Sequence, residues 1–108
     1  MNQQDLRVAG RQQWICRRLK ETRQELGLTL AEVGKKMGAS PARVSDIESG
    51  YYDTKLSSFL KYLDALKVSL ANFAEPMPKS PAPDLEKIKN YKKRNARKSA
   101  DKESQQSS

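Results

Sequence analysis

Apolar residues recur at helical spacing in several stretches of the chain, and short polar or glycine-containing breaks separate them. Between residues 11 and 26, Ile15, Leu19 and Leu26 fall on one face of a helix, which Gly27 closes. Shorter stripes of the same period follow, up to about residue 75. The pattern predicts five short helices, which together make a small all-α bundle.

The second stretch begins with a helix-capping signal. Thr29 and Glu32 have the spacing of a capping box, in which the hydroxyl accepts from a first-turn N–H and the carboxylate reaches back to the N-cap N–H. Val33 and Met37 then give an apolar pair at i, i+4. Gly38 supplies the left-handed residue that commonly ends a helix. A short helix from residue 29 to residue 38 is therefore predicted.

Another helix begins directly after this break. Ser40 is a favourable N-cap, and Pro41 occupies the first helical position, where its missing N–H has no consequence. Val44 and Ile47 form the apolar stripe, and Gly50 ends the helix. Two short helices joined by a tight turn have the layout of a helix-turn-helix.

This stretch resembles the helix-turn-helix of the phage Cro/repressor (XRE-like) family of DNA-binding proteins, over about residues 15–74. The motif residues that agree in one register are Thr29, Glu32, Val33, Lys36, Met37, Gly38, Ser40, Val44, Ser45, Ile47, Glu48 and Gly50. Agreement outside the motif involves Leu19, Arg23, Leu26, Gly27, Leu28, Leu60, Leu66, Val68 and Ser69. Two residues depart from the family pattern. Leu30 replaces a glutamine that commonly touches a DNA phosphate, and Gly34 replaces an alanine.

The resemblance implies a fold, a compact five-helix bundle of the lambda repressor-like type. It also implies that Arg23 of the first helix pairs with Glu48 near the end of the helix 40–49. A charge on the core-facing side of a helix is unfavourable unless it is paired. We therefore assign Arg23 and Glu48 to a structural ion pair rather than to DNA contact.

Candidate DNA contacts lie on and beside the helix 40–49, because the second helix of this motif enters the major groove. The family's base-reading positions, together with a helical wheel in which Val44 points inward, give as candidate base contacts Ser40, Pro41, Ala42, Arg43, Ser45 and Asp46. The expected contacts to the DNA backbone are Thr29, Tyr51, Tyr52 and Lys55. An equally good interpretation makes Tyr51 and Tyr52 ordinary loop aromatics that pack on the next helix.

Two further helices are predicted after this loop. Thr54 is the expected N-cap of a helix over residues 55–66, with an apolar face made of Leu56, Phe59, Leu60, Leu63 and Leu66. Ser69 caps a short helix over residues 70–74 that buries Phe73, and Trp14 is expected at the edge of the core. The family often dimerises through these last helices, so we expect a homodimer.

Charge is distributed unevenly along the chain. The formal net charge is +8, yet residues 14–75 carry ten basic and eight acidic groups, whereas residues 76–108 carry nine basic and four acidic groups. A basic segment of this kind favours a polyanionic partner, with nucleic acid ahead of an anionic membrane. Five tail residues are expected to hold DNA regardless of sequence, namely Lys92, Lys93, Arg94, Arg97 and Lys98. The alternative is a tail that only improves solubility.

Proline and polar composition complete the predicted organisation. It comprises a flexible N-terminus (1–10), a helix-turn-helix DNA-binding domain (11–75), a proline-rich linker (76–83) and a basic, disordered tail (84–108).

Several function classes are excluded by composition. The chain has no histidine and a single cysteine, Cys16, so it offers neither a Cys/His zinc site nor histidine-based catalysis. We interpret Cys16 as a small helix residue near the core. No apolar run approaches the ~18 residues of a membrane span. We therefore expect no enzyme activity, no cofactor, no metal and no membrane partner.

These observations lead to one expected function and two alternatives. We expect a sequence-specific regulator of transcription that binds double-stranded DNA, in the form of a homodimeric repressor acting in the cytoplasm, at the nucleoid, of a prokaryote or in phage infection. The first alternative is an antitoxin-like interaction module whose basic tail binds a partner protein. The second is a degenerate helix-turn-helix retained only for protein contacts, because Leu30, Pro41, Ala42 and Asp46 are unusual in a DNA reader.

Overall fold

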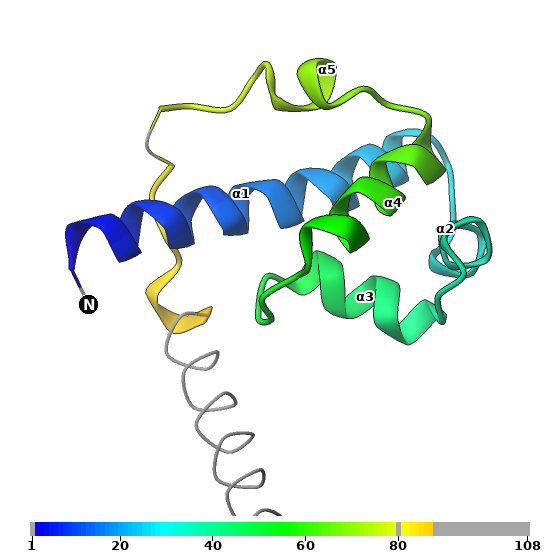
Figure 1. The fold of residues 1–108 in the computed structure, drawn as a ribbon, viewed down its shortest axis with the longest axis horizontal. Helices are drawn as coiled ribbons and strands as arrows, with labels where there is room; N and C mark the ends of the chain where they lie inside the picture. The colour runs from blue at the N-terminus through cyan, green and yellow to red at the C-terminus, as the bar shows by residue number, and fades with distance from the viewer. Residues whose placement is uncertain (1, 80, 88–108) are drawn as a thin grey trace, which may run out of the picture.

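The computed structural model describes residues 2–79 and 81–87, and the described elements are helices joined by short loops (Figure 1). The helices are α1 (Gln3–Glu25), α2 (Leu30–Met37), α3 (Pro41–Ser49), α4 (Leu56–Leu66) and α5 (Leu70–Ala74). Residues 85–87 are helical as well, so a sixth helical segment follows the five that the sequence predicts. The all-α fold is thus as predicted.

α1 is longer than the sequence pattern indicated. The sequence predicted a flexible segment over residues 1–10 and a helix from about Arg11. This prediction was wrong from Gln3 onward, because α1 begins there. Asn2 is the N-cap, and its side-chain oxygen accepts from the Asp5 N–H at 2.8 Å. Leu26 was also misplaced. It lies one residue after the helix ends and is 51% exposed rather than core-facing.

The turn between α2 and α3 forms through the predicted capping residues. Both hydrogen bonds of the capping box are present at the start of α2. Gly38 has the left-handed φ of 75°, and Ser40 accepts from a first-turn N–H of α3. Gly34 allows this turn to be tight, since a Cβ at Gly34 would lie 2.5 Å from the backbone oxygen of Ala39. In this chain, an alanine at position 34 would therefore require the Ala39 backbone to shift.

The core lies where α1, α2, α3 and α4 meet, and α5 covers one edge of it. Its buried members are Leu19, Val33, Val44, Ile47, Tyr62, Leu63, Ala65, Leu66 and Phe73. Trp14 packs at the edge, with its ring centroid 6.2 Å from that of Phe73 in an edge-on arrangement. Cys16 is buried on α1.

α4 differs from its prediction in its cap and in its buried face. The helix begins at Leu56 with Lys55 as N-cap and without a side-chain capping bond, so the assignment of Thr54 as N-cap was wrong. Leu56 is 70% exposed and Leu60 is 46% exposed, whereas Tyr62 is fully buried. At ~100° per residue, the buried face is rotated away from Leu60 toward Tyr62. Placing Leu56 and Leu60 on the core-facing stripe was therefore also wrong.

Within the described residues, no helix is both long and apolar enough to cross a membrane.

Candidate nucleic-acid interface

α3 separates its side chains cleanly into two faces. Val44, Ile47 and Glu48 are buried against the rest of the domain. All six candidate base contacts, from Ser40 to Asp46, are exposed. The predicted reading face is therefore accessible along the first two turns of α3, and it is built on a helix whose opposite side is fixed in the core.

The exposed face of α3 offers few strong hydrogen-bonding groups. Ser40 Oγ already accepts from the Arg43 N–H at 3.1 Å, which leaves the hydroxyl hydrogen to donate. Pro41 and Ala42 offer apolar surface only. Arg43 and Asp46 provide one cation and one anion, so the face is close to neutral. Pro41 has no N–H and the N–H of Arg43 is capped by Ser40, so Ala42 supplies the first-turn N–H that, with the positive end of the helix dipole, suits a phosphate.

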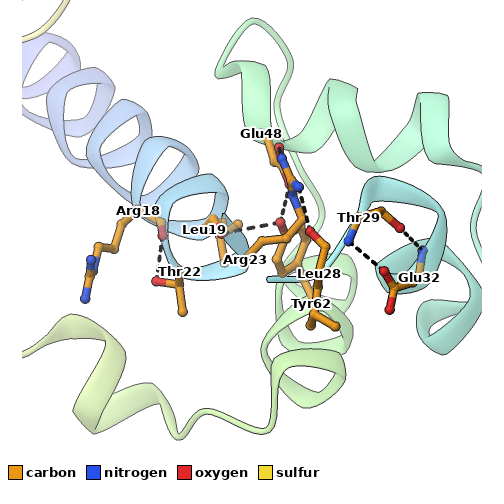
Figure 2. A network of polar contacts seen from close by, with 9 residues as sticks. All are labelled: Arg18, Leu19, Thr22, Arg23, Leu28, Thr29, Glu32, Glu48 and Tyr62. Carbon is orange, nitrogen blue, oxygen red and sulfur yellow. Dashed lines mark hydrogen bonds and ion pairs between the residues drawn. The ribbon is translucent and has the colours of Figure 1, made fainter. Parts of the chain in front are cut away.

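The N-terminus of α2 is partly occupied by its own capping box. The Thr29 N–H donates to Glu32 Oε1 at 3.2 Å, and Thr29 Oγ1 accepts from the Glu32 N–H at 3.1 Å (Figure 2). The hydroxyl hydrogen of Thr29 is what remains for a phosphate. Leu30 is half-buried and packs against the core, so it cannot replace the phosphate-binding glutamine of the family.

A buried polar network fixes α3 to α1 and α4 (Figure 2). Arg23 Nε lies 2.7 Å from Glu48 Oε2 and Arg23 Nη2 lies 3.1 Å from Glu48 Oε1, which makes the contact bidentate. Arg23 Nη1 donates to the Leu28 carbonyl at 2.8 Å. The structure thus contains the ion pair that the family resemblance implied.

Tyr62 completes this network, and its role was not predicted from the sequence. Its hydroxyl donates to Glu48 Oε2 and lies 3.4 Å from the Leu19 carbonyl. The hydrogen bond to Glu48 raises the pKa of Arg23, and burial raises the pKa of Tyr62. Arg23 is therefore charged and Tyr62 neutral at ordinary pH. A buried carboxylate such as that of Glu48 needs hydrogen-bond donors around it. That need is the signal that could have pointed to a hydroxyl donor such as Tyr62.

The loop after α3 is held by α1. Gln12 Nε2 donates to the Tyr52 carbonyl at 3.2 Å, while Tyr51 and Tyr52 are both half-buried. Lys55 is exposed at the start of α4. Lys87 Nζ lies 5.9 Å from the centroid of the Tyr51 ring. Neither Gln12 nor Lys87 was identified from sequence, because both contacts join segments that are distant along the chain.

The five cationic tail residues predicted to hold DNA, from Lys92 to Lys98, lie outside the described residues. Among the residues that the structure does describe, no group of three or more His, Cys, Asp or Glu side chains is placed to hold a metal ion.

Comparison with known proteins identifies the same region. A family model described as helix-turn-helix matches residues 19–73, about half of the chain. Antitoxin HipB of Escherichia coli O6:H1 (strain CFT073) is 34% identical over 56 residues, which cover 52% of this chain and 60% of the relative. Antitoxin HipB of Escherichia coli (strain K12) is 34% identical over 56 residues, covering 52% and 64%. The chain thus spans less than two thirds of the length of these relatives. No solved structure matches.

Proposed function

Because the chain belongs to the phage Cro/repressor-like (XRE-type) helix-turn-helix family, we propose that it is a sequence-specific regulator of transcription that inserts α3 into the major groove of double-stranded DNA. The observation that carries the proposal is the two-sided α3. One face is locked by the Arg23–Glu48 ion pair, and the other exposes the six candidate base contacts. A rigid helix with an accessible outer face is what base readout requires.

The proposed contacts follow from the chemistry of each side chain. Arg43 holds a phosphate or reads a guanine, and Asp46 accepts from a cytosine amino group. Pro41 and Ala42 contact a thymine methyl group. Each of these contacts distinguishes only weakly between base pairs. DNA shape and the spacing of two half-sites therefore supply part of the specificity.

The backbone contacts proposed around this face are Thr29 at the start of α2, and Tyr51, Tyr52 and Lys55 in the loop after α3. Their positions at helix ends and in a loop suit phosphate binding, which fixes register without reading sequence.

We propose a homodimer that represses by occupying an operator which overlaps a promoter, in the cytoplasm of a prokaryote or in phage infection. Exposed leucines on the last helices support self-association, since Leu56 and Leu60 project from α4 and Leu70 from α5. Burying such side chains between two copies removes apolar surface from water.

Selection of bound fragments from sheared host DNA at near-physiological salt, followed by sequencing, tests the proposal. Recovery of a short inverted repeat near a promoter is expected. Arg43→Ala should weaken binding to that repeat, whereas Lys61→Ala, which removes an exposed cation from α4, should leave it unchanged. Recovery of random fragments that are lost on modest salt addition would refute sequence-specific regulation.

The second candidate function is an antitoxin-like module whose tail binds a partner protein. The observation that favours it is that both relatives reported above are named antitoxins. The full chain and a chain truncated after Pro83 would be purified from the host side by side. A protein that accompanies only the full chain, in fixed stoichiometry, would support this function. Identical composition of the two preparations would refute it.

A further inference from the structure

The proline-rich linker turns back across α1. Residues 79 and 81–84, here called the strap, leave the α5 side of α1 and end on the side where α3 lies (Figure 1). The crossing point is Gly10, where an added Cβ would lie 2.0 Å from the Pro81 carbonyl oxygen. Arg11 Nη2 donates to the Lys79 carbonyl at 3.3 Å. Only glycine allows the strap to pass this closely over the helix.

Gln13 fixes the end of the strap. Its Nε2 donates to the Asp84 carbonyl at 3.1 Å, and its Oε1 accepts from the Asp84 N–H. One side-chain amide thus satisfies both backbone polar groups of a residue 71 positions away. Asp84 Oδ1 then accepts from the Glu86 N–H at 3.0 Å and lies 3.4 Å from the Lys87 N, which starts the next helical turn.

This turn brings Lys87 to the C-terminal end of α3. Its ammonium group lies over the ring of Tyr51, the residue that follows the left-handed C-cap Gly50. α3 has no basic residue in its own last turn, and Lys87 places a cation against the residue that follows the C-cap of that helix. The side chain is half-buried, which leaves part of it accessible.

We infer that Lys87 contacts a DNA phosphate next to the α3–α4 loop, so that the strap and this loop form one surface that binds the DNA backbone. The inference rests on the proposed function, because it requires α3 in the major groove. Gln13 is a positioning residue, which acts by holding the strap.

Charge along the chain supports this role for the strap. Residues 76–87 contain two basic and two acidic groups, whereas residues 88–108 contain seven basic and two acidic groups. All of the excess positive charge after the domain therefore follows Lys87 in sequence. Lys87, which lies beside Tyr51, directly precedes that basic segment in sequence.

The test is the salt dependence of binding of the full chain to a short duplex of mixed sequence. A phosphate contact carries no sequence information, so an operator is not needed. Lys87→Ala should reduce the slope of log K against log salt concentration by about 0.9 per bound chain. When salt is raised from about 50 to about 200 mM, the factor by which affinity falls should therefore be roughly 3.5-fold smaller for Lys87→Ala than for the unchanged chain.

Three variants separate this contact from a general effect of charge or of folding. Lys87→Arg should keep the original slope. Lys79→Ala removes the same charge from the strap on the other side of α1, and should also keep it. Gln13→Ala should reduce the slope as Lys87→Ala does, although it removes no charge.

A slope unchanged by Lys87→Ala, or reduced equally by Lys79→Ala, would overturn the inference while leaving the proposed function intact. Absence of binding of the unchanged chain to any duplex would overturn both.

Discussion

Replacing Glu48 by alanine tests the network that joins α1, α3 and α4. The substitution removes both acceptors of the bidentate contact and leaves the Arg23 guanidinium, whose side chain is 10% exposed, without a counter-ion. It also removes the carboxylate acceptor of the Tyr62 hydroxyl. Breaking one partner of a buried ion pair destabilises by about 3–5 kcal/mol, since an uncompensated charge stays in the interior.

A loss of this size is a large part of the stability of a small domain, which is about 5–15 kcal/mol in total. At about 4–8 °C per kcal/mol, Tm should fall by roughly 12–40 °C. Urea and thermal unfolding followed by circular dichroism at neutral pH measure both quantities. Asp46→Ala, which removes an exposed carboxylate from the same helix, is the matched control and should change stability by less than about 0.5 kcal/mol.

A double-mutant cycle then identifies the cause. Arg23→Met in the Glu48→Ala background removes the stranded charge, so the double variant should be more stable than the sum of the single effects predicts, by about 0.5–3 kcal/mol. If Glu48→Ala unfolded at the same urea concentration and temperature as Asp46→Ala, the buried pair would not stabilise the fold, and this reasoning would be refuted.

Three further predictions follow from other features. Gly34→Ala should destabilise the domain despite alanine's advantage of about 1 kcal/mol in helices, because its Cβ would meet the Ala39 carbonyl oxygen at 2.5 Å; a raised Tm would contradict this. Burial raises the pKa of Cys16 from 9.0 to about 11 and raises that of Tyr62 as well, so stability should be full below about pH 9 and fall as pH rises toward 11. Cys16→Ala should lessen that fall in urea midpoint, and an equal fall would exclude the thiol as a cause. Truncation after Pro83 should lower affinity for every duplex and flatten the salt dependence, and an unaltered slope would mean that the tail does not touch DNA.

Local signals in the sequence were sufficient to predict the two helices and the turn of the helix-turn-helix. The Thr29–Glu32 capping box and the Ser40–Pro41 helix start depend on residues three positions apart or fewer, so the chain specifies them without knowledge of the rest of the fold. Gly38 ends α2 for the same local reason. The Arg23–Glu48 pair is different, because its members lie 25 residues apart and only the family resemblance brought them together.

Features that depend on distant packing could not be predicted in this way. Tyr62 reaches the carbonyl of a residue 43 positions earlier, and Gln13 holds the backbone of Asp84 across 71 positions. The early start of α1 also escaped prediction, since residues 3–10 lack an apolar stripe and the strap packs over Gly10. The candidate base contacts remain predictions, of which the structure establishes exposure only, and the candidate backbone contacts Tyr51 and Tyr52 are half-buried.

The division of α3 into a buried and an exposed face has a consequence for how such a regulator changes its target during evolution. The residues that stabilise the domain, Val44, Ile47 and Glu48, are not those proposed to read bases. Mutations on the outer face can therefore accumulate with little effect on folding. Binding preference can diverge between duplicated copies while the scaffold stays the same, and the outer positions of α3 are the natural place to retarget the protein to a chosen operator.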